Sequence, residues 1–241
     1  MSSNIRARGE GMTLRQAALI AGLGYLMPVS YAEFSIWPKL VIAGNIQQTI
    51  LNIAAHPRLF AVAILCYVVT YIEDVVIAWA LYVLLVPVNR SLSLLTAWFR
   101  LVYAAVVLLA CLNLVTVYRL LTTPDYLALF GSGPLHAQVQ LLLRSFRYDE
   151  SFSLVIFGIH LALLGYLIYR SGYLPKIIGV LLFYDGLGWV VVSFQPYLYP
   201  NAHLGFFFTT SFVELVLPLW LLIRGWKISE PIVESTAKPS M

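Results

Sequence analysis

Five ionisable side chains fall near the middle of long apolar stretches of this sequence: Glu73, Asp74, His160, Asp185 and Glu214. A charged side chain at the centre of a membrane-spanning helix costs about 2.5–3.5 kcal/mol on insertion scales. Five such residues at similar depth predict a shared polar pocket inside a helix bundle. Carboxyl and imidazole groups in such a pocket are suited to acid–base catalysis, proton transfer or the binding of a divalent metal.

Two of the acids are adjacent in the sequence. Asp74 shares a helix face with Tyr67 and Tyr71, whereas Glu73 lies about 100° away, closer to Thr70. Like charge and loss of hydration both favour the neutral form of a carboxyl group. We therefore expect at least one of these two side chains to be protonated at neutral pH.

Glu214 is followed four residues later by Pro218, and Thr210 and Ser211 lie on its helix face. A proline at that position removes the hydrogen bond to the carbonyl of residue 214. The carboxyl group and the free carbonyl would then suit a cation, a proton relay or a substrate hydroxyl. The alternative is an ordinary proline kink in which Glu214 bonds to a neighbouring helix.

The remaining candidates come from separate stretches. His160 is either a hydrogen-bonded packing residue or a member of the pocket. Asp185 precedes Gly186 and Gly188, which permit a neighbouring helix to approach closely. Arg100 either snorkels toward the nearer membrane surface or is the counter-ion of one of the acids.

Aromatic residues near the acids could line the pocket and stabilise a developing cation with their π faces, although such residues also form ordinary helix cores. Together with neighbouring hydroxyl groups, they give the candidate substrate-binding residues Tyr67, Thr70, Tyr71, Trp79, Tyr184, Trp189, Thr210 and Ser211.

The composition indicates a membrane protein. Of the 241 residues, 61% are hydrophobic and 11% are charged, about half the charged fraction of a soluble domain. No basic run supports nucleic-acid binding, and Cys66 and Cys111 lie in apolar stretches as small buried residues. No known metal, nucleotide or serine-hydrolase motif occurs, so no cofactor is predicted, although a divalent metal held by His160 and carboxylates stays open.

Six apolar stretches are long enough to cross a membrane, at about 15–37, 59–86, 93–120, 149–169, 175–195 and 205–224. We expect an all-α bundle of six transmembrane helices forming one domain, residues 15–226, between tails 1–14 and 227–241. Lys and Arg concentrate in both tails and in the second-to-third and fourth-to-fifth connections, which predicts cytoplasmic termini. A cleaved signal peptide is the alternative for the first stretch, but its apolar run continues to Trp37, which favours an uncleaved helix.

The two long outer loops have helical periodicity. Apolar residues recur at positions 42, 46, 50 and 53 in the loop 40–58, and at positions 135, 139, 142 and 146 in the loop 124–146. Both loops are expected to form amphipathic helices lying in the membrane interface. Such helices would serve as a packing cap on the bundle or as a lid over an opening.

Several segments together resemble a known family. They include Phe99-Arg100-Leu101, Phe157-Gly158-Ile159-His160, Arg170-Ser171-Gly172-Tyr173-Leu174-Pro175-Lys176 and Leu219-Trp220-Leu221-Leu222-Ile223-Arg224-Gly225. Over nearly its whole length, the chain resembles the bacterial membrane family catalogued as domain of unknown function 4386. The resemblance implies a multi-helix protein of a bacterial cytoplasmic (inner) membrane, and it transfers no reaction and no catalytic residue.

Three functions stay open from the sequence. The leading hypothesis is an intramembrane enzyme for acid–base chemistry on a lipophilic substrate such as an isoprenoid or a lipid, acting like a terpene cyclase or as a metal-assisted lipid hydrolase. The second is a proton-coupled transporter or channel. The third is an accessory or assembly protein whose polar residues join helices. The expected partners are the lipid bilayer and a lipophilic small molecule, and the sequence leaves the oligomeric state open.

Overall fold

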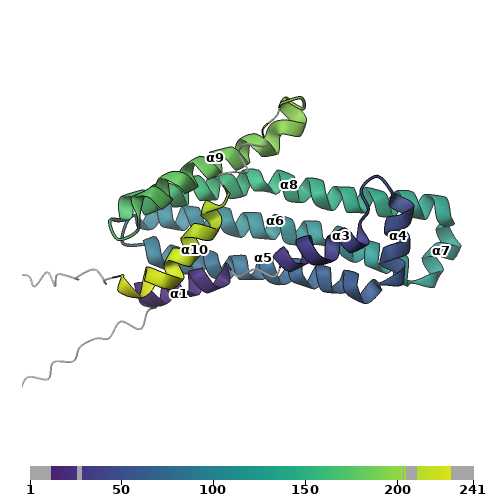
Figure 1. Ribbon diagram of the computed structural model, residues 1–241, viewed down its shortest axis with the longest axis horizontal. Helices are drawn as coiled ribbons and strands as arrows, with labels where there is room; N and C mark the ends of the chain where they lie inside the picture. Colours follow the sequence, from purple (N-terminus) through teal and green to yellow (C-terminus); the bar gives the residue numbers. More distant parts are fainter. Residues whose placement is uncertain (1–11, 26–28, 203, 205–210, 229–241) are drawn as a thin grey trace, which may run out of the picture.

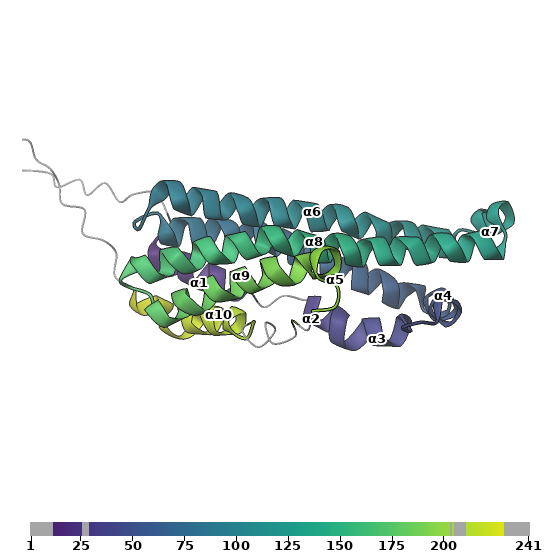
Figure 2. The same ribbon diagram turned by 90° about the horizontal axis from the view of Figure 1, so that it is seen from above.

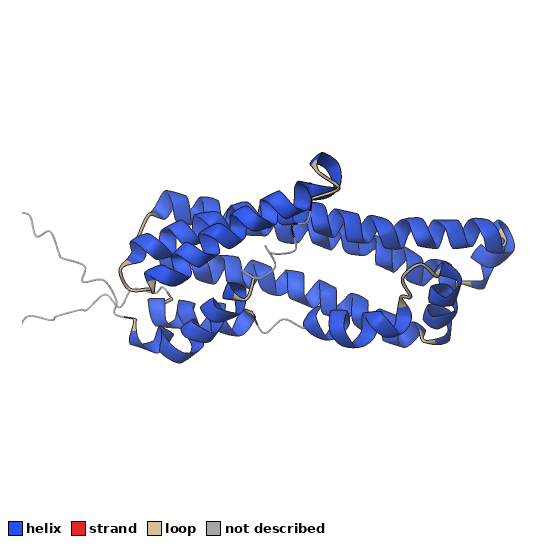
Figure 3. Ribbon diagram, turned by 45° about the horizontal axis from the view of Figure 1, so that its top comes forward, coloured by secondary structure: helices blue, strands red, loops and turns tan. Residues whose placement is uncertain are grey.

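The protein is an elongated bundle built around long helices. The computed structural model describes residues 12–25, 29–202, 204 and 211–228, and every regular element in this part of the chain is helical (Figure 3). Three helices run along the bundle, and a fourth packs beside the last of them (Figure 1). They are α5 (Pro57–Leu85), α6 (Arg90–Thr122), α8 (Ser132–Ser171) and α9 (Lys176–Leu198).

Shorter elements cover the two halves of this frame. Figures 1 and 2 show α1 and α10 beside the half nearer the chain ends, and α3 and α4 beside the opposite half, which α7 closes. These elements are α1 (Leu14–Gly24), α2 (Val29–Tyr31), a π-helix (Ala32–Ile36), α3 (Trp37–Leu40), α4 (Ile46–Ala55), α7 (Pro124–Phe130), α10 (Val213–Arg224) and a 3-10 turn (Gly225–Lys227).

Four of the helices, α5, α6, α8 and α9, are long and apolar enough to cross a membrane. Their most apolar windows have mean hydropathies of 2.0 to 2.3, yet at most half of each window is buried within the protein. Large apolar side chains such as Leu65, Trp98 and Leu109 are instead more than half exposed. An apolar outer surface of this kind is suited to contact with lipid, so the expected membrane-protein class is confirmed. Four of the six expected spans are present as long helices.

The first expected span, residues 15–37, is not a single helix. Helix α1 has 11 residues, about 16 Å, which is half of a typical hydrocarbon thickness. It ends at Gly24, and Tyr25 is its C-cap. The Tyr25 hydroxyl accepts a hydrogen bond from the buried Arg100. In the last expected span, α10 forms the second half, whereas residues 205–210 lie outside the described residues.

The two outer loops differ from one another. Helix α4 is a separate amphipathic helix with Thr49, Ile50 and Ile53 buried. In the loop 124–146, α7 is a separate helix over Pro124–Phe130 only. The expectation that the periodic positions 135–146 form a separate interfacial helix is wrong, because residues 132–146 are the first part of α8. No glycine or proline interrupts the chain between Pro134 and Gly158, so one helix continues. Its 40 residues make it about 60 Å long, roughly twice the hydrocarbon thickness.

Helices α8 and α9 cross at backbone contact through two glycines on each helix. A Cβ atom on Gly165 would lie 2.5 Å from the carbonyl oxygen of Gly179, and one on Gly158 would lie 2.5 Å from that of Gly186. The expected close approach of a neighbouring helix at Gly186 is therefore present. It holds Asp185, which is 1% exposed, against the bundle.

The turn between α8 and α9 is fixed to the end of α5. Gly172 has a positive φ of 73° and ends α8, a conformation that glycine adopts without steric cost. The Tyr173 hydroxyl donates a 2.5 Å hydrogen bond to the carbonyl of Leu84. Burial raises the pKa of Tyr173 to about 12, so this hydroxyl keeps its proton at neutral pH.

Candidate functional site

A buried ion pair lies in the half of the bundle near the chain ends. Arg100 Nη2 and Nε lie 2.5 Å and 2.9 Å from Asp74 Oδ1, and the two residues are 0% and 2% exposed. Arg100 is ten residues, about 15 Å, from the start of α6, which corresponds to half of the hydrocarbon thickness. Of the two alternatives for Arg100, the structure selects the counter-ion of Asp74, because the side chain is completely enclosed and does not reach a membrane surface.

Residues from two further segments, Tyr25 after α1 and His160 on α8, hold the guanidinium of Arg100. Its Nη1 donates a 2.8 Å hydrogen bond to the Tyr25 hydroxyl and lies 3.3 Å from His160 Nε2. His160 Nδ1 lies 2.9 Å from the carbonyl of Thr96. A carbonyl only accepts and a guanidinium only donates, so the imidazole is neutral with its proton on Nδ1. Both ring nitrogens are engaged, and His160 positions Arg100.

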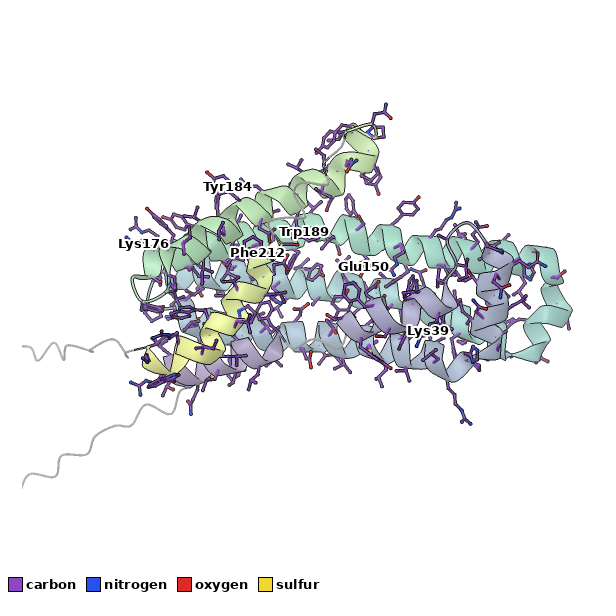
Figure 4. All side chains as sticks on the ribbon, viewed as in Figure 1. Lys39, Glu150, Lys176, Tyr184, Trp189 and Phe212 are labelled. Atoms are coloured by element: carbon purple, nitrogen blue, oxygen red, sulfur yellow. The ribbon has the colours of Figure 1, made fainter. Side chains whose placement is uncertain are left out.

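A second group of acids lies where α9 meets α10. Trp189 Nε1 donates a 2.8 Å hydrogen bond to Glu214 Oε1, and the carboxyl group of Asp185 is close enough to interact directly with that of Glu214. Figure 4 shows Trp189 on α9, and Phe212 just before the beginning of α10. Residues from two helices thus place two carboxyl groups and an indole N–H at one point.

A cavity of about 230 Å³ connects the ion pair with Glu214. Its lining includes the predicted residues Thr70, Tyr71 and Trp189, and it joins side chains from α2, α5, α6, α8, α9 and α10 with Tyr25, which follows α1. The lining residues are Tyr25, Ser30, Thr70, Tyr71, Asp74, Arg100, Tyr103, Leu154, Phe157, Trp189, Glu214 and Leu215. The polar groups therefore share one site whose walls are largely aromatic and apolar.

Other predicted residues are not brought to this cavity. Trp79 and Tyr184 are 51% and 60% exposed, and Figure 4 shows Tyr184 on the outer side of α9. Glu73 is half-buried, and its Oε2 has no hydrogen-bond partner among the described residues. Ser211 lies just before α10, where its carbonyl accepts a 3.0 Å hydrogen bond from the Glu214 N–H. Thr210 lies outside the described residues.

A second polar cluster lies toward α3 and α4. Both terminal nitrogens of Arg147 bind Glu33, at 2.8 Å and 2.9 Å, and Nη1 also lies 3.0 Å from Glu150 Oε2. The Tyr67 hydroxyl donates to Glu33, and the Tyr71 hydroxyl donates a 3.3 Å hydrogen bond to Glu150. Tyr71 also lines the cavity of about 230 Å³, so it links the two clusters.

Comparison with known proteins identifies the family. A sequence model described as domain of unknown function (DUF4386) matches residues 20–225. The chain belongs to the DUF4386 family. It is also 32% identical over 161 residues to an "uncharacterized protein" of Archaeoglobus fulgidus, an alignment covering 67% of this chain and 82% of that protein. No solved structure matches this chain.

The DUF4386 match covers both polar clusters, from Tyr25 and Glu33 to Glu214. Within the described part of this DUF4386 protein, no three or more His, Cys, Asp and Glu side chains form a group able to hold a metal ion.

Two contributors to the polar clusters were missed from the sequence. No sequence pattern around Tyr25 indicates a role for it. Its contact with Arg100 is seen only in the structure. Arg147 could have been found, because it lies three residues before Glu150 on the same helix, the spacing of an intrahelical ion pair. Glu33 is the main partner of Arg147, since it binds both of its terminal nitrogens.

Proposed function

We propose that this protein is an intramembrane acid–base enzyme that acts on a lipophilic substrate, with Glu214 and Asp185 as its proton-handling pair. The observation that supports this proposal best is the position of Glu214 on the wall of the cavity that also contains the Asp74–Arg100 pair. Asp74 has its charge balanced by Arg100, whereas Glu214 forms no ion pair among the described residues. Glu214 is thus the cavity acid with a proton to exchange.

The proposed chemistry uses two neighbouring carboxyl groups that share one proton, since two adjacent carboxylates would repel one another. Glu214 donates the shared proton to an alkene, epoxide or ether oxygen of the substrate. The resulting cation then loses a proton to the Glu214 carboxylate, which shares it again with Asp185. The Trp189 N–H fixes the Glu214 carboxylate between transfers. The rings of Tyr103 and Phe157, whose centroids are 4.8 Å apart, face a developing cation in the cavity.

The cavity size restricts the substrate. Small-molecule sites commonly enclose about 300–1,000 Å³, and this one encloses about 230 Å³. It would hold the reacting end of an isoprenoid or lipid, while the remaining chain passes between helices into the bilayer. Arg100 and Asp74 would contact the polar end of such a molecule as a fixed, charge-balanced pair.

The test is the conversion of membrane lipids by the purified protein. Wild type and the Glu214→Gln and Asp185→Asn variants are incubated in nanodiscs with a total lipid extract, and untargeted mass spectrometry follows the loss and appearance of species. Wild type should convert at least one lipophilic species, and both variants should be slower by about 10²–10⁴-fold, the usual contribution of a positioned acid or base.

Asp149→Asn is the matched control, because Asp149 is an exposed carboxyl group on α8 that bonds to Asn113. It should leave conversion unchanged. Conversion that survives in both Glu214→Gln and Asp185→Asn would overturn the proposal.

A proton-coupled transporter is the second candidate, and one observation favours it. The Tyr71 hydroxyl links the central cavity to Glu150 and so to Arg147 at the opposite half of the bundle. Proton transfer through a membrane protein uses such chains of titratable groups. Proton flux into liposomes that is lost in Tyr71→Phe, without any lipid conversion, would select this function.

We also propose six membrane crossings with both termini in the cytoplasm of a bacterial inner membrane. Arg15 Nε donates a 2.9 Å hydrogen bond to the carbonyl of Ile228, so the two ends of the described chain lie side by side. Arg90, Arg170 and Lys176 begin or end helices at this same end (Figure 1). Such a concentration of basic residues supports a cytoplasmic location.

A further inference from the structure

A second cavity lies at the opposite half of the bundle from the chain ends. It encloses about 430 Å³ between α3, α4 and the first part of α8. Its wall on α8 is polar and basic, with Gln140, Arg144 and Arg147, and its other wall is the chain from Trp37 to Thr49. It contains neither the Asp74–Arg100 pair nor Glu214.

This outer cavity has the chemistry of an anion site. Arg147 is balanced by Glu33 and Glu150, neither of which lines the cavity, and its guanidinium lies 4.3 Å from the centre of the Trp37 ring. Arg144 is exposed and forms no ion pair among the described residues. The cavity therefore has one cation that is not neutralised, and no carboxylate in its lining.

The N-terminus of α4 adds to this positive potential. Asn45 caps the ten-residue helix by accepting a 2.9 Å hydrogen bond from the Gln48 N–H, and both Asn45 and Ile46 line the cavity. The unpaired N–H groups and the dipole at a helix N-terminus favour an anion. Two separate elements, the N-terminus of α4 and the part of α8 that carries Arg144, thus line the same space.

Its depth corresponds to the lipid headgroups. Arg147 is 24 residues before the end of α8 at Ser171, about 36 Å along the helix axis. A hydrocarbon core of about 30 Å that begins near Ser171 would end close to this level. The exposed Tyr148 beside the cavity is typical of the membrane interface.

We propose that the outer cavity binds a phosphate group, and that its position favours the headgroup of an anionic phospholipid as the occupant. Arg144 supplies the balancing charge, and Gln140 and the N-terminus of α4 supply hydrogen-bond donors. The lipid chains then follow the apolar outer surface of the bundle, where Leu51 and Leu141 are exposed. This site is independent of the proposed enzyme chemistry.

The test is lipid binding measured by native mass spectrometry of the intact protein released from detergent. Phosphatidylglycerol and phosphatidylcholine are titrated separately into wild type and into the Arg144→Gln and Gln140→Glu variants. Wild type should bind phosphatidylglycerol more tightly, and each variant should lose about tenfold in affinity for it. That loss corresponds to one hydrogen bond to a charged group.

Arg58→Gln is the matched control, because Arg58 is an exposed arginine at the start of α5, at the same end of the bundle, and it does not line the cavity. It should bind like wild type. Equal affinity for the two lipids, or phosphatidylglycerol binding unchanged in both Arg144→Gln and Gln140→Glu, would overturn the proposal. Displacement of bound phosphatidylglycerol by millimolar inorganic phosphate would support recognition of the phosphate group. Binding of inorganic phosphate without any binding of phosphatidylglycerol would keep the phosphate site but overturn the lipid headgroup as its occupant.

Discussion

At the scale of single residues, Arg100 organises the site. Its guanidinium contacts Asp74 on α5, Tyr25 after α1 and His160 on α8, while Arg100 itself belongs to α6. Removing one partner of a buried ion pair leaves an uncompensated charge, which commonly costs about 3–5 kcal/mol, whereas replacing both partners with apolar residues is often neutral. The pair is therefore expected to specify which helices meet.

Removing one partner of the Asp74–Arg100 pair should therefore cost more stability than replacing both. Asp74→Leu should lower the free energy of unfolding, measured by titration with sodium dodecyl sulfate, by about 3–5 kcal/mol. The double variant Asp74→Leu/Arg100→Met should be closer to wild type than Asp74→Leu alone.

Arg119→Met is the control, since Arg119 is exposed in the last turn of α6, and it should change stability by no more than about 0.5 kcal/mol. The single variant Arg100→Met completes the comparison. If the double variant lost as much unfolding free energy as Asp74→Leu and Arg100→Met lose in total when measured singly, Asp74 and Arg100 would not be coupled.

At the scale of elements, the crossing of α8 and α9 depends on glycine. The atoms nearest to an added Cβ at Gly165 are backbone atoms, the carbonyl oxygen of Gly179 and the N of Phe183, both at 2.5 Å. Backbone atoms cannot rotate away as a flexible side chain can, so even one methyl group must separate the helices. Asp185 is adjacent to Gly186 of this crossing and interacts with Glu214 on α10, so a change in the crossing would reach the proposed acid pair.

Gly165→Ala is therefore expected to destabilise the protein by about 1–3 kcal/mol through overpacking, measured as a lower thermal midpoint in detergent. Gly133→Ala is the comparison, because a Cβ there would have no atom within 4 Å. That variant should be as stable as wild type or slightly more so, since alanine favours helix. Equal midpoints for Gly165→Ala and wild type would show that the two helices separate at little cost.

At the scale of the whole molecule, the two halves of the bundle differ in character. The half with the chain ends contains the apolar α9 and the Asp74–Arg100 pair, whereas the opposite half contains α4, α7 and the charged first part of α8 (Figure 2). Helix α8 is too long to lie entirely within a bilayer. The membrane therefore covers one part of the length of the bundle.

This arrangement predicts which residues are reached from each side of the membrane. After Cys66 and Cys111 are replaced by alanine, single Arg170→Cys and Thr123→Cys variants, both at exposed positions, are treated in intact cells with a membrane-impermeant maleimide. Thr123→Cys should be labelled, and Arg170→Cys should be labelled only after the cells are opened. Labelling of Arg170→Cys in intact cells would contradict the proposed cytoplasmic location of the chain ends.

The amino-acid sequence by itself determined the membrane-protein class and the membrane-spanning parts of the four long helices, although α8 begins well before its expected span 149–169. It also marked most of the buried ionisable residues. Apolar runs of more than 20 residues are local signals, and an ionisable residue within such a run is conspicuous because of its cost. For this reason Asp74, His160, Asp185 and Glu214 were identified before their contacts were known, and three of the four are buried at 2% exposure or less.

Only the tertiary structure decided which of these groups meet. Asp74 is 26 residues from Arg100, and Glu214 is 25 from Trp189, so their pairing depends on how separate helices pack. Helical periodicity gives the face of a residue relative to its own helix, but it does not say whether that face meets protein or lipid. Trp79 and Tyr184 were expected in the pocket but face outward, whereas Tyr25 had no signal in the sequence and contacts Arg100.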